Sequence, residues 1–243
     1  MLGITCALYD EAFELIKISK RQKNNSISYY SGTHKGIPFS LFLTKPGLRK
    51  NTNQFMKWLK INHITELLQT GFCGALSNLY RPGDVCQIKH VLSINKITEY
   101  NQPSAQYHFT NDDHYIKDDK SHSLLTVNYP VLTIDERDSI NDKYTADFID
   151  MEAWHICNLL NDNFPEVKSK IIKIVGDVPG EEPLMRNEIQ MRTFFTEHSF
   201  KNRVKISLKT GISFFELYYR KRMLQKTLKT AVLNYMETKI RNN

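Results

Sequence analysis

The stretch QTGFCGALSNLYRPGDV (residues 69–85) holds the features that decide the fold of this chain of 243 residues. It overlaps the end of an apolar run, Ile64–Thr70, that is typical of a strand buried in a sheet. Gly71 and Gly74 follow at the point where such a strand ends, and a turn at Arg81–Asp84 leads into a second apolar strand. A buried strand that ends in small residues predicts a place where a ligand can approach the backbone closely.

Apolar runs of this kind recur along the chain and alternate with amphipathic helical patterns. Strands are expected at residues 2–8, 28–32, 37–44, 64–70, 85–92, 124–127, 131–134 and 170–175, and helices after residue 8, at 51–62, at 146–161 and from 187 onward. Residues 20–26 are predicted to be a polar turn and 98–122 a long irregular loop. The alternation predicts a single α/β domain over residues 1–243, a three-layer sandwich around a central mixed, largely parallel twisted sheet.

The composition is that of a soluble globular protein, with 41% hydrophobic and 24% charged residues. It excludes collagen-like, disordered and small disulfide-stapled classes. No apolar run approaches the length of about 18 residues that a membrane-spanning helix needs, and the first residues lack the basic start of a signal peptide. The four cysteines are scattered without a C-x-x-C pair, which indicates buried thiols in a reducing compartment. We therefore expect a cytoplasmic protein.

The net charge of +7 is concentrated in the C-terminal part of the chain. Residues 201–243 contain eleven basic and two acidic residues, a net charge of +9, so residues 1–200 are slightly acidic. Within residues 187–243 the pattern is helical and strongly basic. Such a segment could contact an anionic partner such as RNA or a membrane surface, or it could be the solvated face of a docked helix.

Common cofactor and nucleophile motifs are missing from the sequence. There is no glycine-rich phosphate loop, no dinucleotide-binding G-x-G-x-x-G and no G-x-S-x-G elbow. His108 and His114 share a polar stretch with Asp112 and Asp113, but their spacing matches no known set of metal ligands. We expect neither a metal site nor a cofactor.

Four stretches, taken together, resemble a known family. They are GITCALYDEAFELIK (3–17), QTGFCGALSNLYRPGDV (69–85), FIDMEAWHICNLL (148–160) and IIKIVGDVPGEE (171–182). Their order and spacing resemble those of the nucleoside phosphorylase/nucleosidase superfamily, and in particular its methylthioadenosine/adenosylhomocysteine nucleosidase branch. The resemblance implies cleavage of the N-glycosidic bond of a purine nucleoside and assembly into a homo-oligomer, a dimer or a trimer.

The resemblance also implies roles for single residues. Asp177 matches the general acid that protonates the purine N7, and Glu11 matches the carboxylate that activates the attacking water. Glu152 matches the carboxylate that holds the ribose hydroxyls, with Met151 packed under the sugar. The glycine-rich strand end would line the substrate pocket with Gly71, Phe72, Cys73 and Gly74.

The chemistry of the residues agrees with these roles. Cleavage of an N-glycosidic bond passes through an oxocarbenium-like sugar, so it needs protonation of the leaving group and a nucleophile on the opposite face. Each carboxylate also has a structural alternative: Asp177 as a helix N-cap, Glu152 as an acid in the first turn of a helix, and Glu11 as a solvated residue at a helix start. Cys73 is expected to be a small buried side chain and not a nucleophile.

The nucleophile can be water or phosphate. Lys45 and Arg49 follow the third predicted strand and could form the anion site of a phosphorylase. The first strand, however, lacks the arginine that several phosphorylases place there and carries Glu11, which favours water.

Three positions depart from the family pattern. Phe72 replaces a small residue, Gly176 replaces a serine, and Arg137 falls where the nucleosidase branch stacks a phenylalanine on adenine. A catalytically inactive member that acts as a binding protein is therefore the alternative reading.

Overall fold

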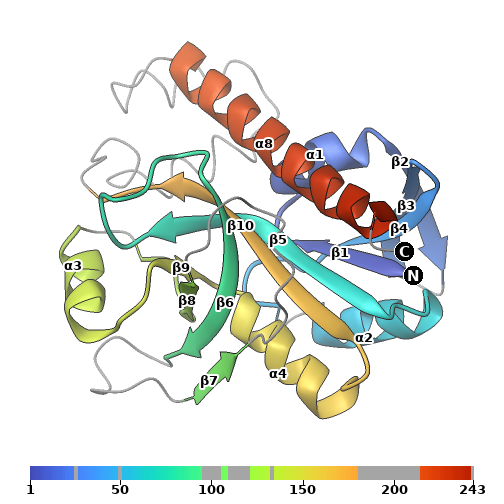
Figure 1. The fold of residues 1–243 in the computed structure, drawn as a ribbon, viewed down its shortest axis with the longest axis horizontal. Coiled ribbons are helices and arrows are strands. Elements are labelled where there is room, and N and C mark those ends of the chain that lie inside the picture. The colour runs from blue at the N-terminus through green and yellow to red at the C-terminus, as the bar shows by residue number, and fades with distance from the viewer. Residues whose placement is uncertain are drawn as a thin grey trace.

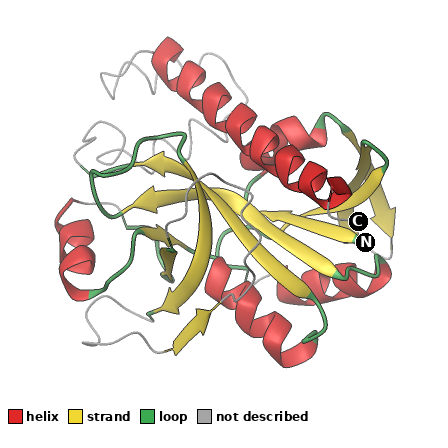
Figure 2. Ribbon diagram, in the orientation of Figure 1, coloured by secondary structure: helices red, strands yellow, loops and turns green. Residues whose placement is uncertain are grey.

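The computed structural model describes residues 1–24, 27–48, 51–94, 105–108, 121–131, 134–179 and 214–241. Strands and helices alternate along most of this chain (Figures 1 and 2). In chain order the elements are β1 (Leu2–Cys6), α1 (Tyr9–Ile16), β2 (Ser19–Asn24), β3 (Ile27–His34), β4 (Ile37–Leu43), α2 (Thr52–Ile61), β5 (Glu66–Ala75), β6 (Val85–Ser93), β7 (Ala105–His108), β8 (His122–Thr126), α3 (Ile134–Lys143), β9 (Phe148–Asp150), α4 (Ala153–Asn163), β10 (Lys168–Asp177) and α8 (Phe214–Arg241).

A mixed sheet forms the centre of the molecule. Strand β1 pairs in parallel with β4 and β5, and β5 pairs in parallel with β10. Strands β3 and β2 continue the sheet beyond β4 in antiparallel pairing. On the other side, β10 pairs with β6, β6 with β8, β8 with β9, and β9 returns to the end of β5. Strands β5, β10, β6, β8 and β9 thus close into a small barrel. Because β1, β5 and β10 run parallel, their carboxyl ends lie on the same side of the sheet.

Helices cover both faces of the open part of the sheet, which confirms the predicted three-layer arrangement (Figure 1). On one face, α1 and α8 pack their apolar side chains on β1 and β10, with Leu15 and Leu228 fully buried. On the other face, α2 and α4 pack together around Trp58, whose ring stacks on Phe42 at a centroid distance of 5.3 Å. Burial of these apolar faces is the main contribution to folding.

Four elements differ from the sequence prediction. Strand β9 (Phe148–Asp150) occupies the start of the helix expected at 146–161, and strand β7 (Ala105–His108) lies within the loop expected at 98–122. The other two are β2 and α3. The polar turn expected at residues 20–26 is largely strand β2, which lies at the edge of the sheet and exposes most of its side chains. An edge strand of this kind lacks the apolar alternation by which strands are recognised. The short strand expected at 131–134 is not seen in the described residues, because Val131 belongs to no strand and Ile134 already begins helix α3. The sequence of this helix, IDERDSINDK, has little apolar periodicity. Most of the long loop expected at 98–122 lies outside the described residues.

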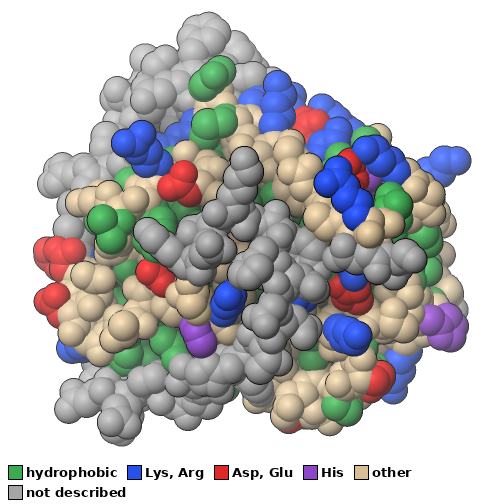
Figure 3. Space-filling model, viewed as in Figure 1, with side chains coloured by type: hydrophobic (Ala, Val, Ile, Leu, Met, Phe, Trp, Pro, Cys, Tyr) green, Lys and Arg blue, Asp and Glu red, His purple; other side chains and the backbone are tan. Residues whose placement is uncertain are grey.

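Helix α8 is an integral part of the fold. Leu224, Leu228 and Val232 are buried on its inner face, and its basic side chains form ion pairs with acidic residues of the body: Lys221–Asp10, Arg222–Glu14 and Lys239–Glu66. Lys and Arg side chains gather on the surface where α8 and α1 lie (Figure 3). Much of the basic charge of this helix therefore holds it to the rest of the chain. Among the described residues, no helix is both long and apolar enough to cross a membrane.

Truncation of Leu228 tests whether α8 contributes to stability. Leu228→Ala should lower the free energy of unfolding by about 2–5 kcal/mol, because it leaves a cavity in a closed core. Thr230→Ala, on the exposed side of the same helix, is the control and should change it by less than about 0.5 kcal/mol. Urea unfolding followed by circular dichroism gives both values. Equal stability of the two variants would show that α8 does not pack on the body as described.

Candidate functional site

A pocket of about 280 Å³ opens at the carboxyl ends of β1, β5, β9 and β10. Its wall is mostly apolar, with charged groups at a few places, as is typical of small-molecule sites. The structure brings most of the predicted site residues together there. Those that line the pocket are Glu11, Phe72, Cys73, Gly74, Met151, Glu152 and Asp177.

Glu11 lies in the first turn of α1 but is buried, with 6% of its surface exposed. Its carboxylate accepts hydrogen bonds from the backbone N–H groups of Ala7 at 2.8 Å, Leu8 at 3.0 Å and Phe72 at 3.1 Å. Burial raises the pKa of Glu11, although these N–H groups and the charge of Lys173 act in the opposite direction. The alternative of a solvated helix-start residue is therefore wrong.

Gly71 makes room for this carboxylate. It does not line the pocket itself, but its φ of +135° is a conformation that other residues rarely adopt. A Cβ at this position would lie 3.0 Å from Oε2 of Glu11. Gly71 thus allows a close approach, as the sequence predicted, but the group that approaches it is the carboxylate of Glu11 and not a ligand.

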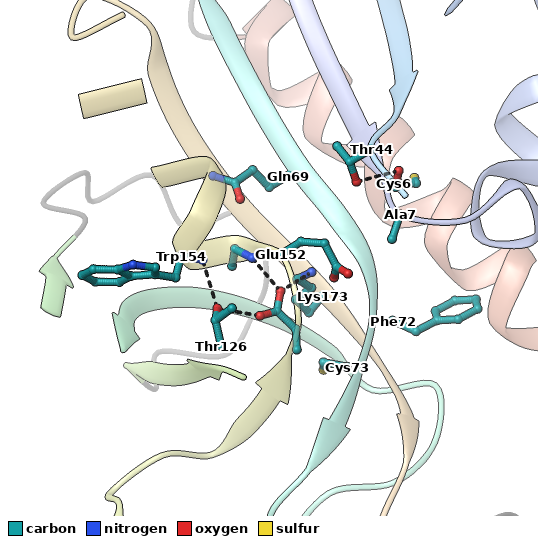
Figure 4. A network of polar contacts seen from close by, with 12 residues as sticks. Cys6, Ala7, Thr44, Gln69, Phe72, Cys73, Thr126, Glu152, Trp154 and Lys173 are labelled. Carbon is teal, nitrogen blue, oxygen red and sulfur yellow. Dashed lines mark hydrogen bonds and ion pairs between the residues drawn. The ribbon is translucent and has the colours of Figure 1, made fainter. Parts of the chain in front are cut away.

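A buried lysine stands behind the pocket. Lys173 extends from β10 directly opposite Gly71 and forms an ion pair with Asp150 at 2.8 Å, with both side chains almost fully buried. Burial alone would lower the pKa of Lys173, but the charges of Asp150, Glu152 and Glu11 raise it overall. Asp150 also accepts hydrogen bonds from Thr126 at 2.7 Å and from the N–H of Ala153 at 3.0 Å. Figure 4 shows Lys173 and Glu152 near one another within this network.

Glu152 is the N-cap residue of α4, but its side chain makes no capping hydrogen bond. Its Oε1 instead accepts a hydrogen bond from the backbone N–H of Gly47 at 3.0 Å. Burial, and then the nearby charge of Asp150, raise the pKa of Glu152 from its ordinary value of 4.5 to about 7, while Lys173 acts to lower it. The carboxylate of Glu152 therefore lines the pocket and does not cap the helix.

The loop that would hold phosphate in the phosphorylase alternative makes other contacts in the structure. Pro46 lines the pocket, and Gly47 already donates its N–H to Glu152. The side chain of Lys45 is exposed and does not line the pocket. Arg49 lies outside the described residues.

Asp177, at the end of β10, forms an ion pair with Arg137 of α3. Arg137 is buried, and its Nη1 donates a hydrogen bond to the carbonyl oxygen of Ala75 at 3.0 Å. Gly74 allows this packing, because a Cβ there would lie 3.0 Å from Nη2 of Arg137. The acid predicted from sequence is thus accompanied by a cation in the pocket.

Helix α8 completes one side of the pocket with Arg220, Lys221 and Leu224. Arg220 donates a hydrogen bond to the carbonyl oxygen of Gly176 at 3.4 Å, and Lys221 pairs with Asp10 at 2.7 Å. The basic C-terminal region therefore contributes directly to the site.

Comparison with solved structures shows proteins of the same architecture. A 5′-methylthioadenosine/S-adenosylhomocysteine nucleosidase of Campylobacter jejuni is 17% identical, with a TM-score of 0.60 over 93% of this chain and 98% of that chain. A Helicobacter pylori enzyme of the same name, solved with butyl-thio-DADMe-Immucillin-A, is 14% identical, with a TM-score of 0.65 over 95% and 97% of the two chains. Futalosine hydrolase of Helicobacter pylori is 14% identical, with a TM-score of 0.62 over 86% and 95%.

The chain has the fold of the nucleoside phosphorylase/nucleosidase superfamily. The fold that the four sequence motifs implied is therefore confirmed. No protein-family model and no curated protein sequence matches the chain. At identities below 20%, the structural likeness shows the nucleosidase fold and leaves the substrate to be argued from the pocket.

Within this nucleosidase fold, sequence reasoning assigned no role to Lys173 or Asp150. Lys173 interrupts an otherwise apolar strand, KIIKIV, and that interruption was the available signal for a buried charge. Asp150 directly precedes the Met-Glu pair that was recognised. Cys73 lies in the pocket, but burial raises the pKa of its thiol well above the usual value, so it is not a thiolate nucleophile. Among the described residues, no cluster of His, Cys, Asp and Glu could hold a metal ion.

Removal of the buried cation tests how strongly the site depends on it. Lys173→Met should lower the free energy of unfolding by about 3–5 kcal/mol, because Asp150 is left buried without its counter-ion. Lys168→Met, at the exposed start of the same strand, should have an effect below about 0.5 kcal/mol. Chemical unfolding at pH 7.5 measures both variants. A similar loss of unfolding free energy in Lys173→Met and Lys168→Met would contradict the buried ion pair between Lys173 and Asp150.

The raised pKa of Glu152 predicts a pH-dependent effect on stability. Because its pKa is higher in the folded state, folding takes up a proton between pH 4.5 and about 7, and this residue destabilises the fold as pH rises through that range. The free energy of unfolding of Glu152→Gln should therefore exceed that of wild type by about 1–2 kcal/mol at pH 8. This difference should vanish below pH 4.5. Glu166→Gln, an exposed control, should show no such trend. A difference in the free energy of unfolding between Glu152→Gln and wild type that does not change with pH would contradict the raised pKa of Glu152.

Proposed function

We propose that this protein is a nucleosidase that hydrolyses the N-glycosidic bond of a purine nucleoside. The observation that carries the proposal is the convergence of Glu11, Glu152 and Asp177 on one pocket from three separate elements. The fold shared with enzymes that are named nucleosidases and hydrolases supports it.

The three carboxylates divide the reaction between them. The bond between C1′ of the sugar and the base nitrogen breaks, and its electron pair passes to the base. Water attacks C1′ on the opposite face and gives its proton to Glu11, while the base takes up at N7 a proton that Asp177 passes on from solvent. Glu152 accepts hydrogen bonds from the sugar hydroxyls, and Met151 lies beside it in the pocket wall. The products are the free sugar and the free base.

Glu11 is suited to act as the base. An ionised carboxylate offers roughly four acceptor positions, and three backbone N–H groups occupy part of them. These bonds fix the orientation of the carboxylate and leave one position for water. Burial raises its pKa, which increases its affinity for the proton of that water.

The charges around the sugar site favour water over phosphate. Glu11, Asp150 and Glu152 lie together with Lys173 as the buried cation among them, and Lys173 is already paired with Asp150. A phosphate dianion placed beside this cluster would be repelled. Among the described residues, the N–H of Gly47 is used by Glu152, and Lys45 is exposed and does not line the pocket.

Base release from purine nucleosides, measured with and without phosphate, tests the proposal. Release should occur without phosphate, and Glu11→Gln and Asp177→Asn should each lower kcat by about 10²- to 10⁴-fold. Asp142→Asn, an exposed acid on α3, should keep full activity.

Release that requires phosphate would assign a phosphorylase instead. If the folded wild type released no base from any nucleoside, the alternative of an inactive, ligand-binding member would hold.

A further inference from the structure

We infer that the base recognised by this site is a 6-oxopurine, and that Arg137 is the residue that selects it. The inference rests on the proposed function and names the substrate class of the same pocket. It follows from the position of Arg137, which lines the pocket and pairs with Asp177. A phenylalanine at this position, as in the family pattern, would offer the edge of the base no charged partner.

The position of Arg137 is fixed by the fold. The side chain is buried, with 3% of the residue exposed, and its two terminal nitrogens are held by Ala75 and Asp177. Gly74 admits the guanidinium against β5 without a Cβ in the way. An arginine held in this manner presents its remaining N–H groups in a fixed direction, so it can discriminate between ligands.

The hydrogen-bonding capacity of Arg137 is not exhausted by these contacts. A guanidinium carries five N–H donors, and Nε of Arg137 has no hydrogen-bond partner among the described residues although it is buried. A buried donor without a partner is costly. Nε itself has no accessible surface, but Nη1 and Nη2 each carry a second N–H and Arg137 lines the pocket, so acceptor atoms of a ligand are the natural partners of those two N–H groups.

The edge of a 6-oxopurine supplies such atoms. O6 is an acceptor that a guanidinium N–H can bind, and N7 is left for the proton that Asp177 supplies. A 6-aminopurine has only N7 as an acceptor on this edge, and its amino group would place a donor against the donors of Arg137. With Asp177 positioned to serve N7, Arg137 faces the substituent at position 6.

The same contact would assist the reaction. When the glycosidic bond breaks, its electron pair spreads from the ring nitrogen to O6 of a 6-oxopurine. The charge of Arg137 stabilises this developing negative charge, while a proton arrives at N7. Arg137 therefore affects kcat as well as substrate binding, which separates it from a residue with a merely structural role.

The test compares inosine with adenosine. Wild type should show kcat/KM at least about tenfold higher for inosine, as expected for one hydrogen bond from a charged donor. Arg137→Gln should reduce or reverse the ratio, because an amide both donates and accepts and so can pair with adenine. Lys143→Gln, the same substitution at an exposed site of α3, should leave the ratio unchanged.

A binding measurement on the wild type keeps the inference testable if Arg137→Gln does not fold. Calorimetric titration should show tighter binding of hypoxanthine than of adenine. Equal or tighter binding of adenine, or a preference for adenosine or uridine in turnover, would overturn the inference and leave the proposed nucleosidase standing. Absence of base release from every nucleoside would instead reject the proposed function, and the two base affinities would still decide the role of Arg137.

Discussion

The ion pair between Lys173 and Asp150 is the constraint on which the site depends. Three carboxylates, Glu11, Asp150 and Glu152, reach the same region from α1, β9 and the start of α4. Without a cation their mutual repulsion and loss of hydration would oppose this arrangement. Lys173 comes from the central strand β10 and supplies that cation inside the sheet. The fold can therefore hold three carboxylates close together in a mostly apolar pocket.

The C-terminal helix links stability to the site. Helix α8 buries an apolar face on the sheet and pairs its basic residues with Asp10, Glu14 and Glu66. Its first described turns also line the pocket through Lys221 and Leu224. The basic charge of residues 201–243 suggested an anionic partner, but a large part of the charge on α8 is directed inward. Removing this helix would be expected to disrupt the fold, so it is not an independent tail.

The sequence predicted the parts of the molecule that follow a regular pattern. The buried strands and the helix at 52–61 show apolar periodicity, and the structure confirms them. The edge strand β2 and helix α3 could not be recognised, because both are polar and are held by their neighbours. Closure of β9 onto β5 depends on two long-range residue pairs that no local pattern encodes.

The sequence also predicted only that part of the site that lies within local motifs. Glu11, Glu152 and Asp177 fall within motifs, and the structure brings them to one pocket. The partners of these acids come from distant segments: Lys173 for Asp150, Gly47 for Glu152 and Arg137 for Asp177. The sequence indicated Arg137 as a departure from the family pattern, and the folded chain shows that it lines the pocket and pairs with Asp177. That cation distinguishes this chain from the pattern on which the first expectation of a substrate was based.

The most direct test of the central claim is a reaction in H₂¹⁸O with a purine nucleoside and without phosphate. The account predicts one ¹⁸O atom at C1 of the released sugar, detected by mass spectrometry before the sugar exchanges with solvent, because water held by Glu11 is the nucleophile. Unlabelled sugar 1-phosphate formed only when phosphate is added would contradict it, since phosphate would then occupy the place assigned to water.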